Sequence, residues 1–269
     1  MKKIIAILLA LVLVLAFAGC GAKETASTGS DNQSSADNTA ATVTTVKAGK
    51  LTMATNAYFQ PYEYYDGDKI VGIDAEIAAA IAEKLGLELE IQDMAFDSII
   101  TAVQEGSVDI GLAGMTVKPD RLEKVDFSIS YANGVQVVIV PENSAITTVD
   151  DLFADGATYK AGVQLGTTGD AYASEDLGSD RVTQYPNGNE AVNALLGGDV
   201  DCVIIDTEPA KSFVANNEGL KILETTYADE DYAACIKKGN KALLEAVDKA
   251  IDELMSDGTI DGIIAKYIK

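Results

Sequence analysis

The sequence predicts an α/β fold built from two similar α/β units, and three observations support this. From residue 50 onward, strand-like apolar runs alternate with segments of helical periodicity. Two matching runs, VDIGLAG (108–114) and VDCVIID (200–206), each follow a helical segment and a small turn. The length of 269 residues suits one large domain or two modest ones. This alternation is typical of a layer of parallel strands covered by helices.

In the first unit, a strand leads into a proline-containing loop and then a helix, because apolar residues recur at 73, 77, 78, 81, 82 and 85. Gly86 stands where that helix should end, and Gly106 ends the next one. Pro119 opens a short helix in its first turn. The expected strands are 51–56, 87–94 and 108–114, and the expected helices are 74–85, 97–106 and 118–125.

The second unit repeats this order, and the chain then ends in a strand and a pair of helices. Residues 158–177 contain a strand, a turn of glycine and threonine, and a helix. The other expected strands are 135–143, 201–206 and 231–240, and the other expected helices are 147–155, 189–200 and the pair in 241–269.

The N-terminus has the features of an export signal. Lys2 and Lys3 precede an apolar and small run, 4–19, which is shorter than the roughly 20 residues of a spanning helix. The stretch FAGC, ending at Cys20, resembles the lipobox of bacterial lipoproteins, although Phe17 replaces the usual leucine. We therefore expect a lipoprotein signal peptide at 1–19 and a lipidated, palmitate-bearing Cys20. The alternative is an ordinary cleaved signal with an incidental cysteine.

Residues 20–46 are rich in Ala, Ser, Thr, Asn, Asp and Gly, and large apolar side chains are almost absent before Val43. Such a segment cannot bury enough apolar surface to fold, so we expect a disordered tether. A flexible coil of about 26 residues reaches on the order of 28 Å. It would hold a folded body just outside a membrane, attached through the lipid anchor only.

The composition excludes several functions. A formal net charge of −22 argues against a nucleic-acid partner and against a basic membrane-binding surface. The absence of histidine removes Ser-His and Cys-His nucleophiles and most zinc sites, so no metal or other cofactor is expected. Cys202 and Cys235 lie in apolar strand-like runs of different units, which favours two buried free thiols.

In open α/β sheets, ligands bind beyond the carboxyl ends of the strands. The loops after the strands are TNAYF (55–59), AGMT (113–116), QLGTTGD (164–170) and IDTEP (205–209). Arg121, one of only two arginines, could fold back over the AGMT loop and bind a carboxylate through two N–H groups. Gly and Thr at the start of the helix after QLGTTGD favour an anion, and Asp206 suits an ammonium group.

One guanidinium, one helix N-terminus and one carboxylate around a crevice together predict an α-amino acid ligand. Each feature also has a simpler explanation. Arg121 could pair with Asp120 or Glu123 on a solvated face, Asp206 could be a turn residue before Pro209, and GTTG could be only a turn.

Several longer motifs resemble the polar amino-acid-binding proteins of bacterial ABC importers, solute-binding protein family 3. The resemblance runs from about Lys50 to Lys269. It rests on ATNAYFQPYEY, IVGIDAEIAAAIAEKLG, MAFDSIITAVQEGSVDIGLAGMTVKPDRLEKVDFS, VQLGTTGD, VDCVIIDTEPA and YAACIKKGN.

This resemblance implies a two-lobed, type II periplasmic-binding-protein-like fold that closes on its ligand by a hinge. Lobe 1 would be 47–131 with 232–269, and lobe 2 would be 132–231. The two strand crossings, near 131–135 and 228–232, would form the hinge. The protein would be a monomer on the extracytoplasmic side of the cell membrane, would deliver its ligand to ABC permease subunits, and would not be an enzyme.

The resemblance also implies roles for individual residues. Arg121 would bind the ligand carboxylate, helped by backbone groups at Gly114, Thr116, Thr167 and Thr168. Asp206 would bind the α-ammonium with oxygens of the 114–116 turn, and Phe59 and Phe96 would enclose the side chain. Asn56 and Gln164 would set selectivity. Relatives that bind cationic ligands often carry a carboxylate at the position of Asn56, so we expect a neutral polar or small side chain. Glu63 and Asp74 are expected to be structural.

Three alternatives stay open. A dehydratase or related lyase on the same scaffold would need Asp, Glu, Lys or Tyr as acid or base, since histidine is absent. The others are a sensory domain for a kinase or channel and a surface lipoprotein without a small ligand. A ligand-dependent thermal shift would separate a true binder from the last of these.

Overall fold

The computed structural model describes residues 43–224 and 226–268, which belong to one compact unit. The predicted signal peptide 1–19, Cys20 and most of the predicted tether 20–46 lie outside the described residues. At the end of the tether, Val43 packs against the core and the Val46 N–H donates to Asp109 Oδ1 at 2.7 Å. Among the described residues, none of the helices is both long enough and apolar enough to cross a bilayer.

Most strands join one nine-stranded mixed sheet, ordered β5-β1-β6-β12-β7-β10-β8-β9, with β11 paired to β7. Three short strands, β2, β3 and β4, form a separate antiparallel sheet. The strands are β1 Lys50–Thr55, β2 Tyr58–Phe59, β3 Glu63–Asp66, β4 Lys69–Val71, β5 Glu88–Asp93, β6 Ile110–Gly111, β7 Val125–Pro141, β8 Ala161–Gln164, β9 Val182–Tyr185, β10 Cys202–Asp206, β11 Leu220–Ile222 and β12 Ala228–Lys237.

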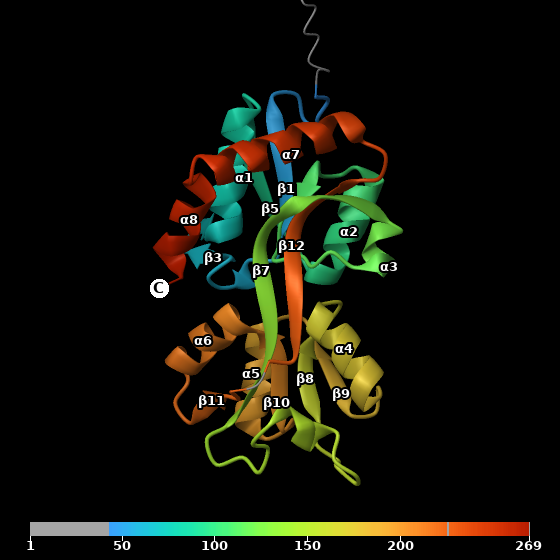
Figure 1. Cartoon of the computed structure of the whole chain (residues 1–269), viewed down its shortest axis with the longest axis vertical. Coiled ribbons are helices and arrows are strands. Elements are labelled where there is room, and N and C mark those ends of the chain that lie inside the picture. The colour runs from blue at the N-terminus through green and yellow to red at the C-terminus, as the bar shows by residue number, and fades with distance from the viewer. Residues whose placement is uncertain (1–42, 225, 269) are drawn as a thin grey trace, which may run out of the picture. The chain divides into compact units, whose positions relative to one another are not determined.

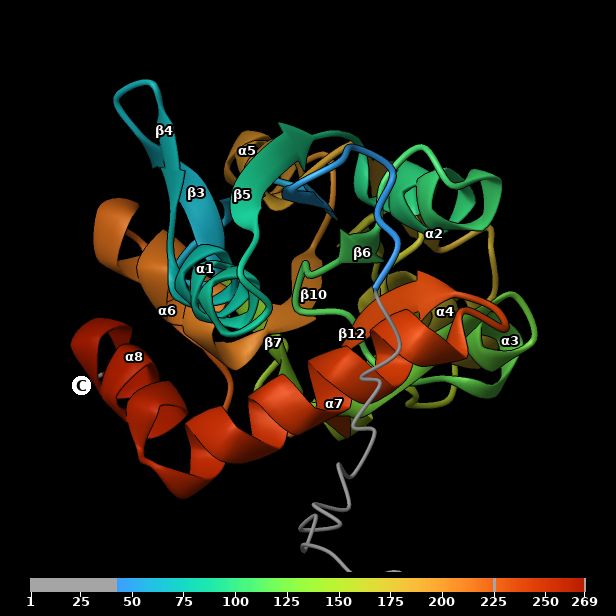
Figure 2. The ribbon, with the colours of Figure 1, turned by 90° about the horizontal axis from the view of Figure 1, so that it is seen from above.

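Helices cover the sheet in two groups, which define two lobes (Figure 1). One group consists of α1 Ile73–Lys84, α2 Phe96–Glu105, α3 Pro119–Leu122, α7 Lys241–Ser256 and α8 Thr259–Tyr267. The other consists of the 3₁₀ turn η1 Val149–Leu152, α4 Thr168–Leu177, α5 Gly188–Gly197 and α6 Thr207–Asn216. From above, α1, α7 and α8 lie together at one side of the first lobe (Figure 2).

Two long strands, β7 and β12, run between the lobes. They pair antiparallel from Val125 opposite Lys237 to Gln136 opposite Ala228, with irregular register around Ala233. The two crossings predicted from the sequence lie within this pair. The fold is therefore the two-lobed α/β fold that the sequence predicts, and its lobes are joined by two adjacent strands.

The helix ends follow the sequence signals closely. Gly106 caps α2 in the left-handed region with φ 76°, where glycine has no Cβ to clash. The Thr167 hydroxyl and the Asn187 side-chain oxygen cap α4 and α5 by accepting from backbone N–H groups three residues later. Several expectations differ from the structure. Residues 147–155 form only the turn η1, 118–125 form only α3, β6 is shorter than the expected strand 108–114, and β7 starts ten residues before the expected strand at 135–143. The helix α6 and the strands β2, β3, β4, β9 and β11 were not expected.

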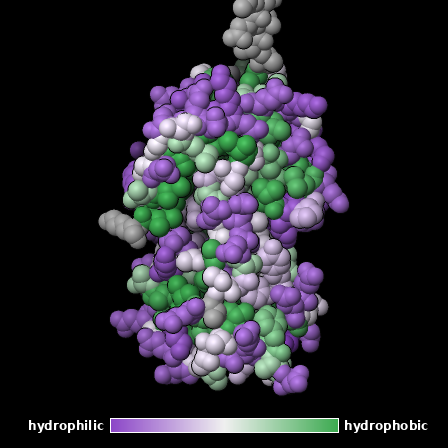
Figure 3. All heavy atoms as spheres, in the orientation of Figure 1, coloured by the Kyte–Doolittle hydropathy of each residue, from purple (hydrophilic) through white to green (hydrophobic). Residues whose placement is uncertain are grey.

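Both cysteines are buried and unpaired, as predicted. Cys202 packs in a cluster with Val138 and Ile204, and Cys235 packs in a second cluster with Ile99 and Val103. Burial raises the pKa of each thiol to about 12, so both stay protonated and unreactive at neutral pH. Outside these clusters, hydrophilic side chains cover much of the face seen in Figure 3, at both ends of the folded body.

Candidate binding site

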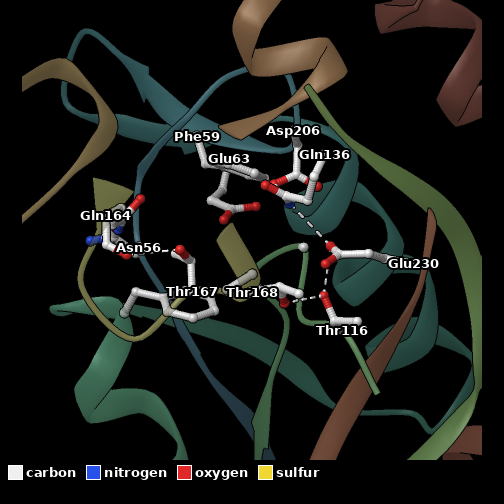
Figure 4. A pocket seen from close by; sticks show the side chains of 13 residues that line it. Asn56, Phe59, Glu63, Thr116, Gln136, Gln164, Thr167, Thr168, Asp206 and Glu230 are labelled. Atoms are coloured by element: carbon white, nitrogen blue, oxygen red, sulfur yellow. Dashed lines mark hydrogen bonds between the residues drawn. The ribbon is translucent and has the colours of Figure 1, made fainter. Parts of the chain in front are cut away.

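A pocket lies where the loops of the two lobes meet (Figure 4). Each of the four strand-end loops predicted from the sequence contributes to it. Nine of the ten predicted binding residues line it: Asn56, Phe59, Phe96, Gly114, Thr116, Gln164, Thr167, Thr168 and Asp206. The tenth, Arg121, lies just behind the lining. Four further residues were not assigned to binding from the sequence: Glu63, Ala113, Gln136 and Glu230.

Arg121 is buried, with only 3% of its surface exposed, so it does not lie on a solvated face. Its Nη1 donates to the Thr116 carbonyl at 2.9 Å, and its Nη2 donates to the Gly166 carbonyl at 3.0 Å. The guanidinium carbon lies 5.4 Å from the centre of the Phe96 ring. Among the described residues, no carboxylate forms an ion pair with it. Burial lowers its pKa, but a guanidinium remains charged at neutral pH.

Asp206 ends β10 and is also buried. Its Oδ2 accepts from Gln136 Nε2 at 2.7 Å, and its Oδ1 accepts from the Tyr232 hydroxyl. Burial and the nearby Glu230 carboxylate raise the pKa of Asp206 well above its usual range. Asp206 is therefore not an exposed turn residue: it holds a carboxyl group inside the pocket.

Glu230 and Gln136 complete this acidic side of the pocket. Glu230 Oε2 accepts from the Thr116 hydroxyl at 2.9 Å and from Gln136 Nε2 at 3.2 Å. The Thr168 hydroxyl in turn donates to Thr116 Oγ1 at 2.8 Å. Gln136 was detectable in principle, because it is the one polar residue in the apolar run VQVVIV. Glu230 lies within the acidic run ADED and gave no distinguishing signal.

Glu63 and Asp74 differ from each other, although the sequence predicted a structural role for both. Asp74 supports the pocket from behind, since its Oδ2 accepts from the Gly114 N–H at 2.7 Å and from the Tyr131 hydroxyl at 2.8 Å. Burial raises its pKa to about 6. Glu63 instead lines the pocket, is fully buried, and has no hydrogen-bond partner for either carboxylate oxygen among the described residues. Burial and the Asp74 charge raise the pKa of Glu63 well above its usual range.

Asn56 and Gln164 bind each other across the opening between the lobes. Gln164 Nε2 donates to Asn56 Oδ1 at 2.9 Å, and Asn56 Nδ2 donates to the Met94 carbonyl at 2.8 Å. The hydrogen bonds of Arg121 to Gly166 and of Thr168 to Thr116 also connect the lobes. The structure is therefore closed. Its cavity volume is ≈ 10 Å³, enough for about one water molecule.

The fold and this pocket define a two-lobed protein whose pocket is lined by residues of both lobes. The family model of bacterial extracellular solute-binding proteins, family 3, matches residues 51–269. The chain belongs to this family.

Three relatives illustrate the match. The arginine-binding extracellular protein ArtP of Bacillus subtilis (strain 168) is 30% identical over 276 residues, which covers 99% of this chain and 98% of ArtP. The solved structure of an ancestral arginine-binding protein bound to glutamine is 38% identical, with a TM-score of 0.77, and covers 82% of this chain and 99% of that one. The solved structure of the ancestral amino acid-binding protein AncCDT-1, a precursor of cyclohexadienyl dehydratase, is 31% identical, with a TM-score of 0.75. The match covers 82% of this chain and 96% of that one.

Proposed function

We propose that this protein is an extracytoplasmic lipoprotein that captures an amino acid by hinged closure and delivers it to the permease of an ABC importer. The observation that carries the proposal is the buried guanidinium of Arg121, which has no ion-pair partner among the described residues and lies beside a pocket lined by three carboxyl groups. A pocket with one cationic and one anionic side is complementary to the carboxylate and ammonium of an α-amino acid.

The ligand carboxylate would lie between Arg121 and the start of α4. In the closed structure Arg121 donates only to carbonyl oxygens, which are weaker acceptors than a carboxylate. The N-terminal turn of α4 begins at Thr168, and its free backbone N–H groups favour an anion. At the other side of the pocket, Asp206 would bind the ammonium group, together with the backbone and hydroxyl oxygens of 114–116.

The electrostatics of the pocket favour a cationic ligand side chain, in contrast to the neutral one expected from Asn56 and Gln164. Those two amides use hydrogen bonds on each other. Glu63, by comparison, is a fully buried acid whose two oxygens have no hydrogen-bond partner among the described residues, and ionising it there without a cation is costly, which raises its pKa. A guanidinium or ammonium on the ligand would pair with Glu63. The relative ArtP and the ancestral homologue are both named as arginine-binding proteins.

Glutamine is the second candidate. Asn56 and Gln164 could exchange their mutual hydrogen bond for bonds to a ligand amide, which needs both a donor and an acceptor. The ancestral arginine-binding homologue was solved with glutamine bound.

We further propose that closure uses the crossings near 131–135 and 228–232, with 47–131 and 232–269 as one lobe and 132–231 as the other. The cavity is too small for an amino acid with the side chains in their present positions, so the lobes must open to admit one. The body would be a monomer held to the membrane by a lipid on Cys20. Its closed form would be the one that the permease recognises, and no chemical change of the ligand is involved.

Calorimetric titration of the ligand-free protein with the twenty common amino acids tests this function. Arginine or lysine should bind best, with a dissociation constant in the micromolar range or tighter, and the ligand should be recovered unchanged. Tightest binding of glutamine would support the second candidate. Binding of none of the twenty, or conversion of the ligand, would refute the proposed function.

A further inference from the structure

Asp206 and Glu230 share a single amide group. They lie on β10 and β12, the two strands on either side of β7, which carries Gln136. Gln136 is the register partner of Asp206 on one side and of Ala228 on the other. Its Nε2 donates to both carboxyl groups, at 2.7 Å to Asp206 and 3.2 Å to Glu230. All three residues belong to paired strands of one sheet, and Glu230 lies at the crossing between the lobes.

The cluster has more acceptors than donors. Gln136 Oε1 and Glu230 Oε1 are both buried and have no hydrogen-bond partner among the described residues. Both residues line the pocket (Figure 4). With Asp206, they place three acceptor groups on one side of the pocket, and an ammonium group offers three N–H donors.

The cluster also has more negative charge than its surroundings can balance. Among the described residues, Arg121 is the cation that acts on both acids, but its guanidinium donates to carbonyl oxygens instead. The other titratable groups that act on the pair or line the space beside it are acidic or neutral: Glu63 on β3, Tyr62 before it, Tyr232 on β12 and Glu208 on α6. In this environment, ionising both of two adjacent buried carboxyl groups costs more free energy than ionising one of them.

We propose that Glu230 is a second acidic contact for the ligand ammonium and forms with Asp206 a two-carboxyl site that holds one proton until the ligand displaces it. This inference rests on the proposed binding of an amino acid. The proton passes from the carboxyl pair to the solvent, and the ligand keeps all three of its ammonium hydrogens. Ligand and proton therefore compete for the same pair of acids.

The direction of the pH effect follows from this competition. Burial raises the pKa of Asp206 and of Glu230, and the nearby Glu230 carboxylate raises the pKa of Asp206 further. The pair therefore keeps a proton closer to neutral pH than isolated acids do. Affinity should fall as the pH falls through this raised range, by up to tenfold per pH unit for one displaced proton.

The first experiment compares two variants of β12 by calorimetry, with L-arginine as the probe. Glu230→Gln removes the buried charge and should weaken binding by tenfold or more. Asp229→Asn removes the same charge from an exposed neighbour and should bind like the wild type. Both variants should melt cooperatively. Wild-type affinity in Glu230→Gln, or an equal loss in Asp229→Asn, would overturn the assignment of Glu230.

The second experiment counts protons and needs no variant. The binding enthalpy at pH 7 is measured in phosphate and in Tris, whose ionisation enthalpies differ. The difference between the two binding enthalpies, divided by the difference between the buffer ionisation enthalpies, gives the number of protons released. We expect up to one proton for the wild type and about none for Glu230→Gln. No release by the wild type would refute proton displacement. If the wild type binds amino acids and needs Arg121 but releases no proton, only this inference fails. If it binds none of the twenty, the proposed function fails as well.

Discussion

Replacing Glu63 with glutamine tests the cationic side chain of the ligand most directly. The substitution keeps the shape of the side chain and removes a fully buried carboxyl group whose two oxygens have no hydrogen-bond partner among the described residues. A hydrogen bond to a charged group is worth roughly 1.5–3 kcal/mol, so the loss of one such bond to the ligand corresponds to about a 10- to 150-fold loss of affinity. Arginine binding should weaken by this factor, whereas glutamine binding should stay the same or strengthen.

The same substitution should stabilise the ligand-free protein at alkaline pH. A raised pKa means that the folded state holds the Glu63 proton more tightly than the unfolded state does. The stability that this proton gives the wild type is therefore complete below the pKa of Glu63 in the unfolded state. It is lost as the pH rises through the higher pKa of Glu63 in the folded state. Thermal melts of ligand-free wild type and Glu63→Gln at pH 5 and pH 8 measure this. Unchanged arginine affinity together with a lower melting temperature at pH 8 would refute the reasoning.

Three further predictions concern the carboxylate contact, the loop behind it and the anchor. Arg121→Ala should weaken amino acid binding by at least a hundredfold, since two charge-assisted bonds are lost, while the protein still melts cooperatively; retained affinity in calorimetry would exclude the carboxylate role. Gly114→Ala should weaken binding, because φ is +52° and the new Cβ would lie 2.8 Å from Cε1 of Phe59; a wild-type dissociation constant would contradict this. Cys20→Ser should release the protein from membranes in cell fractionation, and continued membrane attachment would argue against lipidation.

The sequence was most informative where local chemistry determines the structure. Glycine at 106 and the polar caps at 167 and 187 end or begin helices for reasons that lie within a few residues. The strand-end rule selected the four loops of the pocket because it follows from the topology of parallel strands. The family resemblance then assigned eight binding residues within those loops, and all eight line the pocket; the ninth assigned residue that lines it, Phe96, lies outside the loops at the start of α2.

The sequence was least informative where contacts between distant segments determine the position of a residue or helix. Glu63 comes within a loop that folds into the small β2-β3-β4 sheet, so its position could not be read from periodicity. Glu230 is one acid in an acidic run, and only the pairing of β12 with β7 turns it inward. Helix α6 contains Pro209 in its first turn and a short apolar stripe, and packing against β7, β10 and β11 completes it.

The position of β12 has a consequence for how the chain reaches its folded form. This late strand lies between β6 and β7, and the two helices after it pack on α1, where Lys84 pairs with Glu253 at 3.2 Å. The first lobe therefore cannot be assembled from the first half of the polypeptide alone. If the chain is exported N-terminus first, as we propose, its early segments would remain without their central strand until the last forty or so residues arrive, and the first lobe would fold only after passage through the membrane.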